Sequence, residues 1–71
     1  MNIEVNNSYK ILIEINDVVL TYKCKVIFID DNFITFIDDR NKEYTYNKKC
    51  VLSFSDLGYD IELNKWGKND F

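Results

Sequence analysis

Apolar and polar side chains alternate along most of this chain, which is the pattern of half-buried β-strands. The clearest alternation runs from Tyr9 to Ile15 and leads into Asn16-Asp17, a pair typical of tight turns. A long strand is expected over residues 18–29. Shorter strands are predicted over residues 33–37, 43–47, 51–54 and 59–63, with a weak one over residues 2–5.

The register of the first hairpin follows from its turn. With Asn16-Asp17 as the loop, the facing pairs are Ile15 with Val18, Ile13 with Leu20, Ile11 with Tyr22, and Lys10 with Lys23. One face is then wholly apolar, and it continues through Cys24, Val26 and Phe28. Because a one-residue slip would move this whole set into water, we expect this register and a buried face.

The end of the long strand is ambiguous, because its second face is apolar too. Val26 and Phe28 are expected to point one way, yet Ile27 and Ile29 on the other side are also hydrophobic. One interpretation is a strongly bent strand that serves both halves of a small barrel. The other is an outer apolar patch that contacts a partner.

Composition narrows the fold class. The chain has no His, Pro, Ala or Gln, and 15% of its 71 residues are aromatic. Good helix formers are therefore scarce, and β-branched and aromatic residues are abundant. A barrel is the best arrangement of five short strands on a thin core, because closure removes exposed edges. We expect an all-β fold: one domain over residues 1–71, a small five-stranded antiparallel barrel with strand-like N- and C-terminal extensions.

Two segments carry a resemblance to a known architecture. Residues 22–38 (YKCKVIFIDDNFITFID) and 43–54 (EYTYNKKCVLSF) resemble the small barrels of the Sm-like and Src-homology-like group in spacing and hydrophobic pattern. The resemblance covers about residues 9–55 and implies the same five-stranded barrel. The Sm-like pattern matches at Val26, Asp30 and Phe33. The group's glycine and RNA-contacting asparagine fall at Cys24 and Ile34, and its Arg-Gly pair near Leu52-Ser53, so its RNA site does not carry over.

No set of side chains has the spacing of an enzyme or metal site. Without His, no Ser-His or Cys-His pair can form, and two cysteines are too few for a zinc site. Two acidic pairs, Asp30-Asp31 and Asp38-Asp39, lie at opposite ends of one strand, roughly 20 Å apart. We expect a non-enzymatic protein with no metal or cofactor. Free thiols are favoured at Cys24 and Cys50, because a reducing cytosol disfavours disulfides, and a disulfide between the two is the alternative.

The chain carries no pattern of secretion or membrane insertion. Its N-terminus has no basic region followed by an apolar run, and the longest apolar run covers only residues 26–29. About 20 apolar residues are needed to span a bilayer. The expectation is a cytoplasmic protein with no membrane contact.

Two groups of residues are candidates for binding. Contact with another protein or with a second copy is expected at Tyr59, Trp66, Phe71, Ile27 and Ile29. Trp66 either caps the open end of the barrel or anchors an arm that adds a strand to a partner. A basic surface with interleaved aromatic rings, typical of single-stranded nucleic-acid binding, would contain Lys23, Lys25, Tyr44, Tyr46, Lys48 and Lys49. The net charge of −3 disfavours this second group, because it opposes attraction to phosphates.

These observations favour a protein–protein interaction module. The abundance of Lys, Asn, Ile, Phe and Tyr reflects AT-rich codons and suits an accessory protein of a phage or mobile element, one that binds and inhibits a host factor. The alternatives are a nucleic-acid-binding small barrel and a subunit of a homo-oligomeric assembly.

Overall fold

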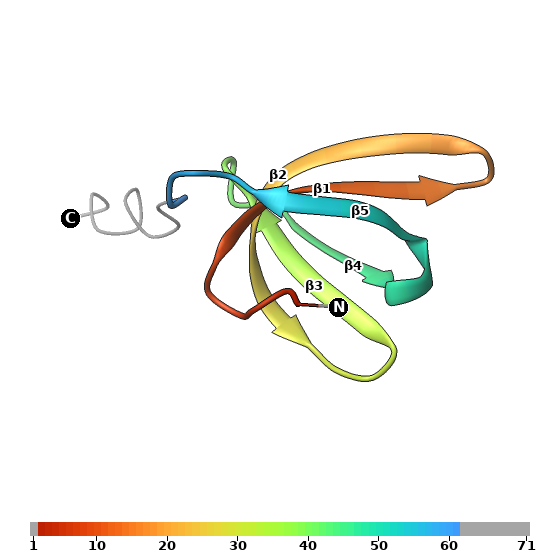
Figure 1. Cartoon of the computed structure of the whole chain (residues 1–71), viewed down its shortest axis with the longest axis horizontal. Helices are drawn as coiled ribbons and strands as arrows, with labels where there is room; N and C mark the ends of the chain where they lie inside the picture. Colours follow the sequence, from red (N-terminus) through yellow and green to blue (C-terminus); the bar gives the residue numbers. More distant parts are fainter. Residues whose placement is uncertain (1, 62–71) are drawn as a thin grey trace.

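A computed structural model describes residues 2–61 of the protein, and these residues form five antiparallel strands (Figure 1). The strands are β1 (Ser8–Ile15), β2 (Val18–Ile29), β3 (Phe33–Asp38), β4 (Glu43–Asn47) and β5 (Val51–Asp56), with a single 3₁₀ turn, η1 (Lys48–Cys50), between the last two. The predicted all-β class and the strands within residues 9–55 are confirmed. Among residues 2–61, no helix is long and apolar enough to cross a membrane.

The strands form one sheet in the order β4-β3-β2-β1-β5. Within residues 2–61, β4 and β5 are its two outer strands, and no ladder joins them. The sheet is therefore not closed, and the predicted barrel closure is not confirmed. The two predicted terminal strands are also absent from the described residues, since residues 2–5 and 59–61 have no strand conformation.

The β1–β2 hairpin has the predicted register in full. Ile15 faces Val18, Ile13 faces Leu20, Ile11 faces Tyr22 and Lys10 faces Lys23. Asn16 and Asp17 have φ of 52° and 67°. Positive φ at both loop residues is the signature of a type I′ turn, whose twist matches that of the flanking strands.

A β-bulge near the end of β2 corrects the expectation for its two faces. Val26 pairs with Phe36, but Phe28 already pairs with Thr35, so Ile27 is an extra residue on β2. The bulge reverses the alternation that follows it. Phe28, expected beside Val26 in the core, is 52% exposed, whereas Ile29, expected on the outer face, packs against the core.

The core lies on the concave face of the curved sheet. Its buried members are Ile3, Tyr9, Ile11, Ile13, Cys24, Val26, Ile34 and Phe36. The N-terminal segment reaches this core although it is not a strand: Asn6 N–H donates to the Val26 carbonyl, and Val26 N–H donates to the Asn7 carbonyl. Both cysteines are free thiols, with Cys24 buried and Cys50 half-buried.

Candidate protein-interaction surface

The distal part of the β1–β2 hairpin extends beyond the rest of the sheet. β5 pairs with β1 only as far as Ile13, and β3 pairs with β2 only from Cys24 onward. Residues 14–23, which we name the hairpin tip, therefore have no strand partner outside the β1–β2 hairpin among the described strands. Figure 1 shows this tip projecting at one end of the molecule, whose longest dimension is 43 Å.

The hairpin tip exposes apolar side chains on both of its faces. Val18 and Leu20 lie on the core face and are 55% and 37% exposed, and Val19 lies on the opposite face and is 48% exposed. Ile13, directly opposite Leu20, is fully buried. The core thus ends partway along the hairpin, although the apolar pattern continues to the turn.

A cluster of four aromatic rings borders the hairpin tip on its core face. The ring centroid of Tyr22 lies 4.6 Å from that of Tyr44 and 5.1 Å from that of Phe36. Tyr46 completes the cluster, since its hydroxyl shares a hydrogen bond with the Tyr22 hydroxyl. Burial, reinforced by this hydrogen bond, raises the pKa of Tyr22 well above its usual value. The three tyrosines of this neutral cluster are half-buried, and Phe36 is fully buried beneath them.

The turn between β3 and β4 lies beside this cluster and is organised by Asp38. Burial of Asp38 acts to raise its pKa, but hydrogen bonds from the Lys42 and Arg40 backbone N–H groups and from the Tyr44 hydroxyl outweigh it. The pKa of Asp38 is therefore held below its usual value. These bonds fix a turn that borders a shallow hollow of about 340 Å³ next to Thr21, Tyr22 and Lys23.

Charges of opposite sign flank the exposed apolar residues. Glu14 and Asp17 lie in the distal half of the hairpin tip, and both are exposed. Lys23 and Arg40 are exposed at the rim of the hollow, at the proximal end of the tip. Among residues 2–61, the only ion pair joins Lys25 to Asp60, so these four charges are unpaired within the described part of the chain.

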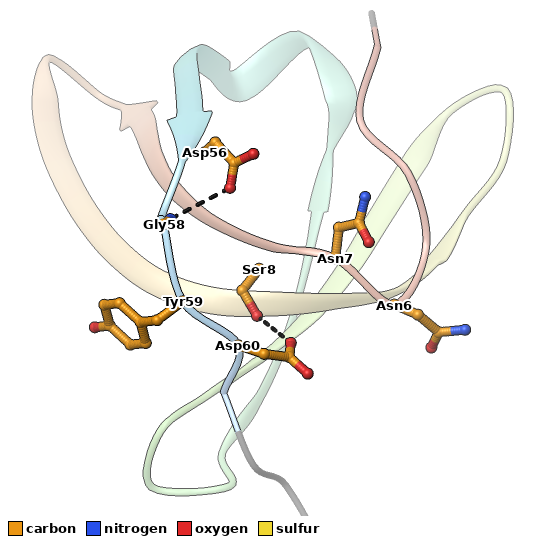
Figure 2. A pocket seen from close by; sticks show the side chains of 7 residues that line it. All are labelled: Asn6, Asn7, Ser8, Asp56, Gly58, Tyr59 and Asp60. Atoms are coloured by element: carbon orange, nitrogen blue, oxygen red, sulfur yellow. Dashed lines mark hydrogen bonds between the residues drawn. The ribbon is translucent and has the colours of Figure 1, made fainter.

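A second hollow, of about 450 Å³, lies at the other end of β1 and is polar. Figure 2 shows Ser8 and Asp60 facing each other there, with the Tyr59 ring pointing away. The Ser8 hydroxyl donates to Asp60 at 2.9 Å and accepts the Ile61 backbone N–H at 3.0 Å. The hydrogen bond from Ser8 and the ion pair with Lys25 hold the pKa of Asp60 below its usual value. These contacts attach the segment after β5 to the start of β1.

The six residues predicted to bind nucleic acid do not form one surface. Lys23 and Lys25 point outward from β2, whereas the rings of Tyr44 and Tyr46 lie on the core face with Tyr22. Lys25 is paired with Asp60, and the Lys48 ammonium donates to the Asp30 carbonyl at 2.9 Å. Lys49 is exposed on η1. Lys23 and Lys25 therefore project from the face opposite the two rings, although Lys23 also lines the hollow beside Tyr44.

The residues predicted to contact a protein partner are also dispersed. Tyr59 is 60% exposed beside the polar hollow, Ile27 is half-buried at the bulge, and Ile29 packs against the core. Trp66 and Phe71 lie outside the described residues. The predicted outer patch of Ile27 and Ile29 is thus replaced by Phe28, together with Phe33 at 45% exposure.

The exposure of Val18 and Leu20 was not predicted, because the pattern assigned both residues to the core. The signal was present: Val18, Val19 and Leu20 are three consecutive apolar residues directly after a tight turn. Such a run cannot be hidden on one face of a strand. In the turn after β2, the Asp30 carboxylate accepts the Asn32 and Phe33 backbone N–H groups.

Comparisons with known proteins identify no relative of this chain. No family model matches the sequence, and no curated protein or solved structure matches it. Within residues 2–61, no group of three or more His, Cys, Asp or Glu side chains is arranged to hold a metal ion.

Proposed function

We propose that this chain is a non-enzymatic protein–protein interaction module and that the hairpin tip is its contact surface. The observation that carries the proposal is the exposure of Val18, Val19 and Leu20 on a hairpin that extends past its own core. At about 2 kcal/mol for each fully buried aliphatic side chain, covering the exposed fractions would contribute about 3 kcal/mol. A protein partner would supply that cover.

The barrel-like architecture belongs to the same proposal. Both outer strands pack against one core, with Tyr44 and Tyr46 from β4 and Val51 and Phe54 from β5. This shared core supports a small barrel of the Sm-like or Src-homology-like kind, open between β4 and β5. In such a scaffold the short sheet holds the hairpin tip in place, as rigid frameworks commonly hold binding loops.

The nucleic-acid alternative has less support. Two of its lysines, Lys23 and Lys25, lie on the face of the sheet opposite the Tyr44 and Tyr46 rings, and the net charge is −3. Single-strand binding commonly combines base stacking on aromatic rings with a positively charged groove that follows the phosphates. Action against a host factor and a phage or mobile-element source stay predictions drawn from composition.

Site-specific photo-crosslinking in the cells that express this chain tests the proposal. A photoreactive side chain at Val19 is expected to form covalent adducts with protein. The same group at Asp31, exposed on the turn at the far end of β2, is the matched control and should form few. Adducts at both positions alike, or at neither, would refute the hairpin tip as a contact surface.

A further inference from the structure

We propose that the hairpin tip pairs with the hairpin tip of a second copy of this chain, as antiparallel strands related by a two-fold axis at Val19. This inference rests on the proposed function, because it names the partner of the same surface. The two copies would form one continuous sheet across their β2 strands. Addition of a strand to an open sheet edge is a common mode of protein recognition.

The backbone of β2 offers unused hydrogen-bonding groups at this edge. Val26 exchanges both its backbone hydrogen bonds with Asn6 and Asn7, on the β1 side. Because bonding direction alternates along a strand, even-numbered residues of β2 before the bulge bond toward β1 and odd-numbered residues away from it. Val19, Thr21 and Lys23 therefore direct their N–H and C=O groups to the side where β3 has not yet begun.

The open edge of β2 lacks the features that protect the two outer strands, β4 and β5, from pairing with another chain. β4 carries the exposed Glu43 and is flanked by Lys42 and Lys48, and charges on an edge discourage pairing. β5 is bent by a bulge at Leu52, since Leu12 faces Ser53 while Ile13 faces Val51. Residues 18–21 contain no charge, no proline and no bulge. Among the open edges of β2, β4 and β5 in the described residues, only that of β2 over residues 18–21 has none of these protective features.

Symmetry restricts the register of the pairing. Facing residues of antiparallel strands lie on the same face of the sheet, so a two-fold axis normal to the sheet must pass through a residue position. An axis at Leu20 would bring the turn of the second copy opposite Cys24, which already pairs with Asp38. An axis at Val19 avoids β3. It places Val18 of each copy opposite Leu20 of the other.

The flanking charges complement each other in this register. Asp17 of the second copy would lie opposite Thr21, and its turn would approach Lys23 and Arg40 at the rim of the hollow. The same contact is repeated at the other end by symmetry. The acidic turn of each copy thus meets the basic rim of the other, and Val18 and Leu20 cover each other on the core face.

Disulfide trapping tests the register directly. In the variant Val19→Cys, the two new thiols would face each other at the Cα separation of about 5.5 Å that suits a disulfide. At about 100 µM protein, within the weak range expected for so small an interface, mild oxidation should give several-fold more covalent dimer than in the wild type or in Leu52→Cys. Leu52 is the matched control, because it is 53% exposed on the bulged strand. Equal dimer in Val19→Cys and Leu52→Cys would overturn the proposal.

Sedimentation without any oxidant measures dimerisation independently, in the wild type and in two further variants. Val19→Lys would place two like charges face to face and is expected to weaken dimerisation at least ten-fold, whereas Leu52→Lys should leave it unchanged. A wild-type protein that stays monomeric at millimolar concentration would overturn the proposal. If photo-crosslinking at Val19 captures only a foreign protein, the proposed function stands and the second copy is refuted.

Discussion

The core ends partway along the β1–β2 hairpin, and this allows a quantitative prediction about one cross-strand pair. Ile13 and Leu20 face each other, yet Ile13 is fully buried and Leu20 is 37% exposed. We predict that Ile13→Ala lowers the free energy of unfolding far more than Leu20→Ala does. The two substitutions remove the same number of carbon atoms from neighbouring positions, so the pair isolates the effect of burial.

The expected magnitudes follow from the two environments. Ile13→Ala removes about 2.4 kcal/mol of transfer free energy and leaves a cavity, for a total of about 3.5 kcal/mol. At Leu20 about two-thirds of the transfer term applies and solvent fills the space, which gives about 1.5 kcal/mol. A chain of this length has a total stability of about 4–10 kcal/mol. The melting temperature should fall by about 15–25 °C for Ile13→Ala and by about 5–10 °C for Leu20→Ala.

Urea unfolding followed by circular dichroism measures both values. The protein concentration should be a few micromolar, on the order expected to keep a weak dimer dissociated, because association would add apparent stability. Equal losses for the two variants, within about 0.5 kcal/mol, would mean that the tip of the hairpin is as well packed as its base. The hairpin tip would then lose its basis as a contact surface.

Three further predictions concern other parts of the molecule. Ser8→Ala removes the hydroxyl that binds Asp60 and the Ile61 N–H. It should lower the free energy of unfolding by about 1–2 kcal/mol and speed hydrogen exchange at the Ile61 N–H. Unchanged exchange would show that Ser8 does not anchor this segment. Asp38 has a lowered pKa in the folded state, so its contribution to the free energy of unfolding is present above its unfolded pKa of about 3.9 and is lost as the pH falls through the lower folded value. Asp38→Asn should therefore flatten the acid limb of a curve of stability against pH. An unchanged acid limb would contradict this role of Asp38. Burial raises the pKa of Cys24 to about 12, so Cys50 should react with a thiol reagent at pH 8 while Cys24 reacts only on unfolding; equal rates in the native protein would disprove this.

The first hairpin was predictable to the residue because two local signals agreed. The turn residues Asn16 and Asp17 tolerate positive φ, and the apolar period of two allows only one register across them. Neither signal depends on the rest of the chain. The strand bounds elsewhere were also close, since turns at Asp30 and Asp38 are closed by their own carboxylates.

The bulge at Ile27 was not predictable from the pattern. Ile27, Phe28 and Ile29 are all apolar, so either face could have been buried. The N-terminal segment bonds to Val26 on one edge of β2 and β3 pairs along the other edge, and the bulge directly follows Val26. Long-range pairing therefore decided that Phe28 points to solvent and Ile29 to the core.

By itself, the sequence determined the all-β class, the strands within residues 9–55 and the hairpin register, because these depend on local alternation and turn chemistry. Tertiary structure decided where burial stops. An apolar face is buried only where another element covers it, and β3 and β5 are both shorter than the hairpin they flank. The same residues that the pattern assigned to the core, Val18 and Leu20, are therefore exposed at the hairpin tip.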